Sequence, residues 1–149
     1  MNKRKGVAGQ TQISFGMIFS IILIIFFIAF AIYGITKFLE VNKLAQIEKF
    51  KSDFQADINS MWKSTQGSQN VEYLLPKKIS QVCFTDTEFE NMYFIPSDYD
   101  GAILENIDIT KIIKNSTSNP KKLCIESSNG KISMTIKKDY NENLVTITK

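Results

Sequence analysis

The order of apolar and polar residues divides the chain into two parts. Ile13 to Ile35 form an uninterrupted run of 23 mainly apolar residues, and no charged side chain occurs from Gly6 to Thr36. As a helix, this run spans about 35 Å, against a hydrocarbon thickness of about 30 Å. A helix that is apolar on every face could be buried only in a much larger protein, so the run predicts a membrane span rather than a core helix.

A cleaved secretory signal is the main competing interpretation of this run. The apolar region of such signals is about 7 to 15 residues long and ends at a cleavage site with small residues. Here the run is longer and ends in the sequence Tyr-Gly-Ile-Thr-Lys-Phe. Removal after the run is therefore disfavoured.

Beyond the span, apolar residues recur at steps of three or four, as on one face of a helix. No proline or glycine interrupts residues 36–66, and Gln66-Gly67-Ser68 is a strong stop signal. We expect one continuous helix from about Ile13 to about Ser64, with its first half in lipid and its second half packed under a head. The predicted apolar stripe comprises Leu44, Ile47, Phe50, Phe54, Ile58 and Met61.

After the helix, the chain changes to short apolar runs separated by Pro, Gly, Asn and Asp, which is typical of strands. Asn129-Gly130 suits a tight hairpin, so the last three strands are expected to form a meander. Ile103 to Ile113 stays open between a strand and a short helix. The expected strands are Val71–Leu75, Ile79–Phe84, Met92–Ile95, Leu123–Ser127, Lys131–Ile136 and Leu144–Thr148.

These patterns predict an α+β fold, in which a long N-terminal helix packs on a small antiparallel sheet. Residues 1–12 are a basic tail, residues 13–35 the transmembrane helix, and residues 36–66 an amphipathic helix that continues the span. Residues 67–149 are the β-rich head. Four aromatic residues of the head and one at the end of the helix are expected to pack between helix and sheet. They are Tyr73, Phe84, Tyr93 and Phe94 of the head and Trp62 of the helix.

Charge sets the expected orientation. Lys3, Arg4 and Lys5 are the only ionisable side chains before Lys37, and a basic flank favours the cytoplasmic side. The head is therefore expected outside the cell membrane. From Lys37 onward, 18 − 3 = 15 Lys and Arg face 15 Asp and Glu, so this part is neutral and offers no basic face for nucleic acid.

The composition disfavours an enzyme. Histidine is absent, which removes the commonest general base and zinc ligand. We find no nucleophile paired with a base and no phosphate-binding loop, and we expect neither a cofactor nor a metal. Asp98-Tyr99-Asp100-Gly101, preceded by the acidic residues Asp86, Glu88 and Glu90, loosely resembles a calcium loop but lacks a third acidic position and the distal glutamate. A solvated acidic turn is the preferred interpretation.

Two features depend on the orientation. Cys83 and Cys124, with 40 residues between them, suit one disulfide if the head is outside, and two buried free thiols if it is cytoplasmic. Asn115-Ser116-Thr117 fits a glycosylation acceptor at Asn115, or is an ordinary polar loop.

The amino-terminal sequence resembles that of a known family. Lys3-Arg4-Lys5-Gly6 is followed by Val7-Ala8-Gly9-Gln10-Thr11 and then by the apolar run. This order resembles the class III signal peptides of type IV pilins, in particular the archaeal pilins and archaellins. The resemblance implies that a prepilin-type peptidase cuts between Gly6 and Val7, with Gly9-Gln10 as second choice. Bacterial pilins have a glutamate where this chain has Thr11, so the departure points to the archaeal branch.

The resemblance implies a structural subunit that assembles through its apolar helix and exposes its head at the cell surface. The implied partners are the lipid bilayer, copies of itself or related subunits, and the peptidase. Two alternatives stay open. The basic tail could belong to an uncleaved signal anchor, and the protein could be a non-polymerising, single-span binding or accessory protein of the cell envelope.

Overall fold

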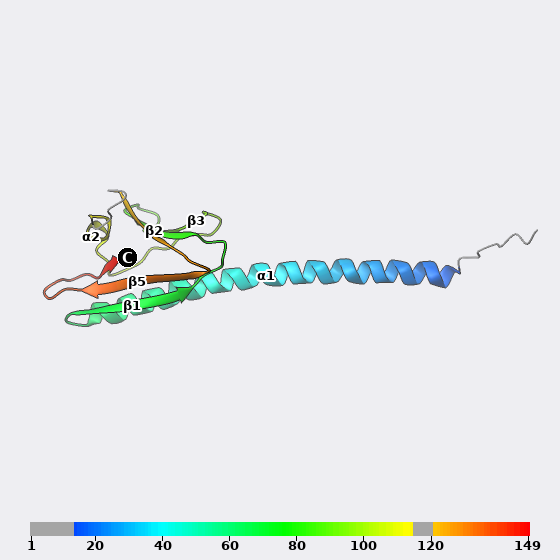
Figure 1. The fold of residues 1–149 in the computed structure, drawn as a ribbon, viewed down its shortest axis with the longest axis horizontal. Coiled ribbons are helices and arrows are strands. Elements are labelled where there is room, and N and C mark those ends of the chain that lie inside the picture. Colours follow the sequence, from blue (N-terminus) through cyan, green and yellow to red (C-terminus); the bar gives the residue numbers. More distant parts are fainter. Residues whose placement is uncertain (1–13, 115–120) are drawn as a thin grey trace, which may run out of the picture. The chain divides into compact units, whose positions relative to one another are not determined.

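The computed structural model describes residues 14–114 and 121–149 and confirms the predicted α+β fold. By its internal contacts the chain divides into two units, Met1–Glu40 and Val41–Lys149. The elements, in chain order, are α1 (Phe15–Lys63), β1 (Gly67–Leu74), β2 (Gln81–Thr85), β3 (Met92–Ile95), α2 (Ile109–Lys114), β4 (Lys122–Glu126), β5 (Lys131–Lys138) and β6 (Thr146–Thr148) (Figure 1).

The long helix α1 is confirmed, within two residues of the predicted bounds at each end. Its last carbonyl groups have no partner inside the helix and need donors from elsewhere. The Ser64 amide donates to the Met61 carbonyl at 3.1 Å, and the Lys138 ammonium donates to the carbonyls of Trp62 and Ser64. This cation at the negative end of the helix dipole favours the observed stop.

The second half of α1 forms one side of the core of the C-terminal unit. Four of the predicted stripe residues are at most 2% exposed, and Met61 is 9% exposed. The inclusion of Leu44 was wrong, because this side chain is 49% exposed and the core cluster begins one turn later, at Ile47. Helical periodicity therefore predicted the buried face but not where the face begins.

The strands form two antiparallel sheets, ordered β1-β5-β6 and β3-β2-β4. The predicted meander was therefore wrong in part: β5 does pair with β6, but β4 pairs with β2 in the other sheet. The turn itself is present, with positive φ at Asn129 and Gly130, and Ser128 and Lys131 exchange two backbone hydrogen bonds of 2.8 and 2.9 Å. Immediately before it, the Ser127 amide donates to the Ser80 carbonyl, which holds β4 against the β2 side.

The segment left open at Ile103–Ile113 ends as a helix. The Asp108 carboxylate accepts from the Lys111 amide at 2.9 Å, the arrangement of a helix N-cap, and α2 follows. Just before the cap, Ile107 makes a parallel bridge to Val145. Of the two open alternatives, the structure shows the short helix, which covers the second half of the segment, after a loop with one isolated bridge.

An aromatic cluster joins α1 to both sheets. Phe54 stacks on Phe50 with ring centroids 5.6 Å apart, and meets Tyr73 of β1 at 5.6 Å and Phe84 of β2 at 6.1 Å. Phe94 is also buried, against Phe50. Two of the five residues expected here differ: Tyr93 is only half-buried, and Trp62 is 40% exposed, with its indole N–H donating to the Asn143 carbonyl.

Replacing Gly130 by Ala is expected to destabilise the protein by about 1–2 kcal/mol, because its φ of +77° disfavours a side chain and a Cβ there would lie 2.7 Å from the Leu75 carbonyl oxygen. Asn129→Gly keeps a positive φ accessible at the neighbouring position and is the matched control. Urea unfolding followed by fluorescence of the single tryptophan should separate the two variants. Equal stabilities would contradict the assigned turn.

Candidate functional site

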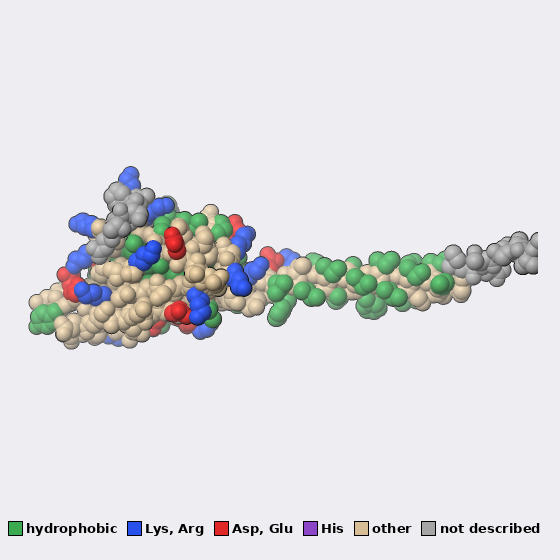
Figure 2. Space-filling model, in the orientation of Figure 1, with side chains coloured by type: hydrophobic (Ala, Val, Ile, Leu, Met, Phe, Trp, Pro, Cys, Tyr) green, Lys and Arg blue, Asp and Glu red, His purple; other side chains and the backbone are tan. Residues whose placement is uncertain are grey.

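The feature that most needs a functional explanation is the uncovered apolar surface of α1. We call Phe15–Thr36 the apolar segment. Its large side chains are all exposed, for example Phe27 at 64% and Tyr33 at 62%. Figure 2 shows hydrophobic side chains along this part of the helix, without charges between them. A window of 18 residues in α1 has a mean hydropathy of 3.0 and is 0% buried, so α1 is long and apolar enough to cross a membrane.

Two hydroxyl side chains of the apolar segment, those of Ser20 and Thr36, are bonded within the helix itself. Ser20 Oγ donates to the Gly16 carbonyl at 2.8 Å, and Thr36 Oγ1 donates to the Tyr33 carbonyl at 2.8 Å. Hydrocarbon offers no partner for an unpaired hydroxyl, so such internal bonds are what a lipid-facing helix requires. The hydroxyl groups are therefore compatible with immersion in lipid.

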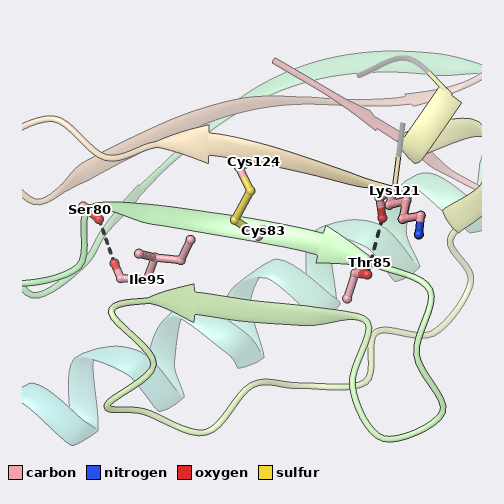
Figure 3. Close-up of a disulfide and its surroundings, with 6 residues drawn as sticks. All are labelled: Ser80, Cys83, Thr85, Ile95, Lys121 and Cys124. Carbon is pink, nitrogen blue, oxygen red and sulfur yellow. Dashed lines mark hydrogen bonds between the residues drawn. A yellow bond between two sulfur atoms is a disulfide. The ribbon is translucent and has the colours of Figure 1, made fainter. Parts of the chain in front are cut away.

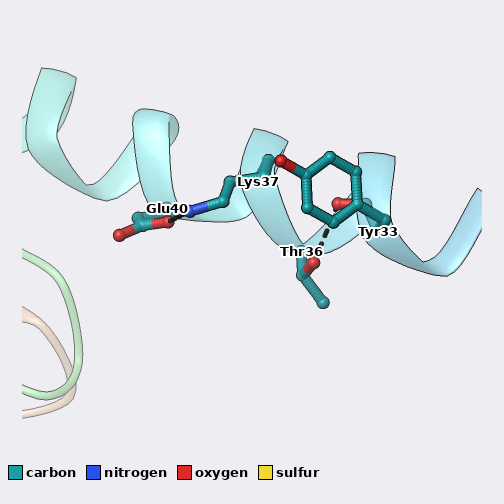
Figure 4. Close-up of polar contacts among 4 residues, drawn as sticks. All are labelled: Tyr33, Thr36, Lys37 and Glu40. Carbon is teal, nitrogen blue, oxygen red and sulfur yellow. Dashed lines mark hydrogen bonds and ion pairs between the residues drawn. The ribbon is translucent and has the colours of Figure 1, made fainter. Parts of the chain in front are cut away.

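The first charged side chains of α1 follow directly after the apolar segment. Lys37 Nζ lies 2.9 Å from a Glu40 carboxylate oxygen, one helical turn beyond Tyr33 (Figure 4). Tyrosine and lysine are residues that anchor helices at the lipid–water interface, since each has an apolar body and a polar end. Farther along, Lys49 pairs with Asp53 and Lys51 with Glu48. Charged side chains thus begin within one turn of the apolar segment, while exposed apolar side chains such as Phe38, at 71%, and Val41, at 63%, continue among them.

The two cysteines lie together in the sheet β3-β2-β4. Cys83 of β2 is directly opposite Cys124 of β4, and the two sulfur atoms form a disulfide (Figure 3). The Cys83 side chain is fully buried. The bond joins residues 41 positions apart in the sequence and links the C-terminal third of the chain to β2. A stable structural disulfide is characteristic of an oxidising compartment.

A polar contact fixes α1 to β1 beside the aromatic cluster. The Tyr73 hydroxyl donates to the Asp57 carboxylate at 2.5 Å. Burial, the hydrogen bond to Asp57 and the negative charge of that carboxylate all raise the pKa of Tyr73 above its ordinary value of 10.0. On the surface, ion pairs with Asp98 and Glu142 raise the pKa of Lys78 and Lys111, respectively.

Tyr73→Phe is expected to lower the free energy of unfolding by about 1–2 kcal/mol near neutral pH, because it leaves Asp57 without this donor. The raised pKa also predicts a pH effect. Above about pH 10 the unfolded state loses the Tyr73 proton while the native state keeps it, so this contribution declines as pH rises. Unfolding measured from pH 8 to 11 should show a smaller decline in the variant. A decline of equal size in both proteins would contradict this role.

The other predicted positions are not brought into one site. Gly6 and Val7 of the processing site and Asn115 of the glycosylation triplet lie outside the described residues. Asp98 is paired with Lys78, and among the residues that the structure describes no three acidic or cysteine side chains are arranged to hold a metal ion.

Sequence reasoning missed two exposed apolar side chains on the C-terminal unit. Phe89 is 88% exposed and Ile103 is 64% exposed, and both line one open hollow. Phe89 lies between two glutamates in the sequence, and Ile103 lies in the short apolar run Ala102-Ile103-Leu104, so neither belongs to a periodic pattern that would mark it as exposed.

Comparisons with protein families, curated proteins and solved structures give no significant match for this chain.

Proposed function

We propose that this protein is a membrane-anchored structural subunit of the type IV pilin kind, which assembles through its apolar segment and exposes its head outside the cell. The observation that carries the proposal is the uncovered apolar surface of Phe15–Thr36, in a helix whose second half is core of the C-terminal unit. The protein thus has a stable folded unit and an apolar helix that needs another environment. The proposal includes no catalytic step.

Assembly in this proposal is a transfer of the apolar segment between two apolar environments. A lipid bilayer covers the segment while the subunit is stored, and the helices of neighbouring copies or related subunits replace the lipid in a filament. Such a transfer requires little hydrophobic free energy, since lipid tails and apolar side chains solvate the segment about equally well. Close packing between helices then supplies the preference for the assembled state.

Two observations support an outside location of the head. Lys3, Arg4 and Lys5 precede the span, and this basic flank favours the cytoplasm. The Cys83–Cys124 disulfide suits the oxidising side of the membrane. Both support a single-pass protein with its N-terminus in the cytoplasm and its C-terminal domain in the extracellular space.

The pilin-like part of the proposal rests on the sequence Lys3-Arg4-Lys5-Gly6 before the apolar run. Its test is the intact mass of the membrane-extracted protein, co-expressed with an archaeal prepilin peptidase. We expect a loss that corresponds to Met1–Gly6. Gly6→Val should abolish that loss, and Gly9→Val, the matched control, should not. If only Gly9→Val blocks processing, the cut follows Gly9 instead.

A full-length mass in the presence of active peptidase would contradict the pilin-like proposal. The protein would then be a non-polymerising, membrane-anchored binding or accessory protein of the envelope, because an unprocessed basic tail serves only to orient the span.

A further inference from the structure

The C-terminal unit has an open hollow that the proposed function does not use. Its volume is about 540 Å³, and it lies between the loop before β3 and the loop that returns to Ile103. Three aromatic side chains line it, those of Phe89, Tyr93 and Tyr99. Phe89 is 88% exposed although it is one of the largest apolar side chains of this unit, so its ring is free to cover a ligand.

The same hollow is lined by two carboxylates, Glu90 and Asp100. Among the described residues, no lysine or arginine lines it. Lys78 is paired with Asp98, and neither residue belongs to the lining. The hollow therefore combines negative charge with aromatic surface. Aromatic rings attract cations through their negative faces, and a ring of aromatic side chains is a known way to recognise organic ammonium groups.

Glu90 is held against the wall of the hollow rather than free in solvent. A Cβ at Gly101 would lie 2.0 Å from Glu90 Oε2 and 2.3 Å from the Met92 carbonyl oxygen. Because residue 101 is a glycine, the Glu90 carboxylate can occupy the space that a side chain at this position would fill. The Glu90 side chain is only partly exposed. A partly desolvated carboxylate attracts a cation more strongly than one in bulk water.

From this combination we propose that the hollow binds an organic ammonium group, held between the aromatic side chains of Phe89, Tyr93 and Tyr99 and the carboxylates of Glu90 and Asp100. Metal ions are poorer candidates, because no three ligand side chains converge there among the described residues. An ammonium group on an apolar carbon frame satisfies both the charge and the exposed rings. This inference does not depend on processing at Gly6 or on assembly.

The test uses the full chain in a maltoside detergent, which carries no ammonium group. Choline and its neutral isostere 3,3-dimethylbutan-1-ol are titrated in parallel by calorimetry; the two probes share their shape and differ in charge. We expect choline to bind about tenfold more tightly. Nα-acetyl-lysinamide, in a third titration, distinguishes a lysine side chain from a quaternary ammonium group as the preferred ligand.

Variants assign the binding to the hollow. Glu90→Gln keeps the shape of the side chain and should weaken choline binding about tenfold, whereas Glu88→Gln, two residues earlier and outside the lining, should not change it. If neither ammonium probe binds the wild-type protein more tightly than the neutral isostere, the inference is wrong. Because that comparison needs no variant, it holds even if a substitution disturbs folding.

Discussion

Replacing Phe54 by Ala is expected to lower the free energy of unfolding by about 3–5 kcal/mol. Phe54 is 0% exposed, and its ring meets another ring of α1 and rings of both sheets, through Phe50, Tyr73 and Phe84. The loss combines the hydrophobic transfer of a buried phenyl ring with the cavity that it leaves. A deficit of this size is a large share of the stability of an ordinary domain.

The measurement is urea unfolding of the full chain in detergent, followed by the fluorescence of Trp62. The matched control is Phe89→Ala, which removes the same group from a side chain that is 88% exposed and should change stability by less than about 0.5 kcal/mol. Similar losses at both positions would show that α1 does not form the core as described.

Removing the disulfide by Cys83→Ala together with Cys124→Ala is expected to cost about 4 kcal/mol. In the chain-entropy model, the bond restricts the unfolded state by closing a loop of 41 residues. The burial of Cys83 adds a small loss of packing in the double variant. The β2–β4 pairing has its own backbone hydrogen bonds, so the native fold should persist with reduced stability.

Unfolding of the wild-type protein with and without reductant provides the internal control, because reduction breaks the bond without changing the sequence. Reduced wild-type protein and the double variant should have similar midpoints, both well below that of the oxidised protein. If reduction leaves the midpoint unchanged, the disulfide contributes nothing to stability.

The sequence was most informative where one pattern decides the structure. An apolar run without a charge predicts a helix that no soluble core of this size can hold, and periodicity continues the helix through Ile47, Phe50 and Phe54 to Met61. Both predictions depend on local order along the chain and were confirmed in the structure. The positive φ values at Asn129 and Gly130 likewise follow from the types of these two residues.

The sequence was less informative where distant segments compete for a partner. Asn129-Gly130 fixes only the four residues of the turn, whereas the choice of β2 as the partner of β4 depends on contacts about 40 residues away. Leu44 fits the helical stripe but lies one turn before the core begins. The hollow at Phe89 could not be predicted, because loops bring its residues together without any periodic pattern.

The central claim is that the apolar segment spans a membrane and that the head is outside. Its most direct test is a membrane-impermeant amine-reactive label applied to intact cells, followed by alkaline extraction of the membranes and mass spectrometry of the protein. We predict that the protein stays in the membrane pellet and that head lysines such as Lys114 and Lys137 carry the label before the cells are permeabilised. Release by alkali would contradict the span, and labelling only after permeabilisation would place the head in the cytoplasm.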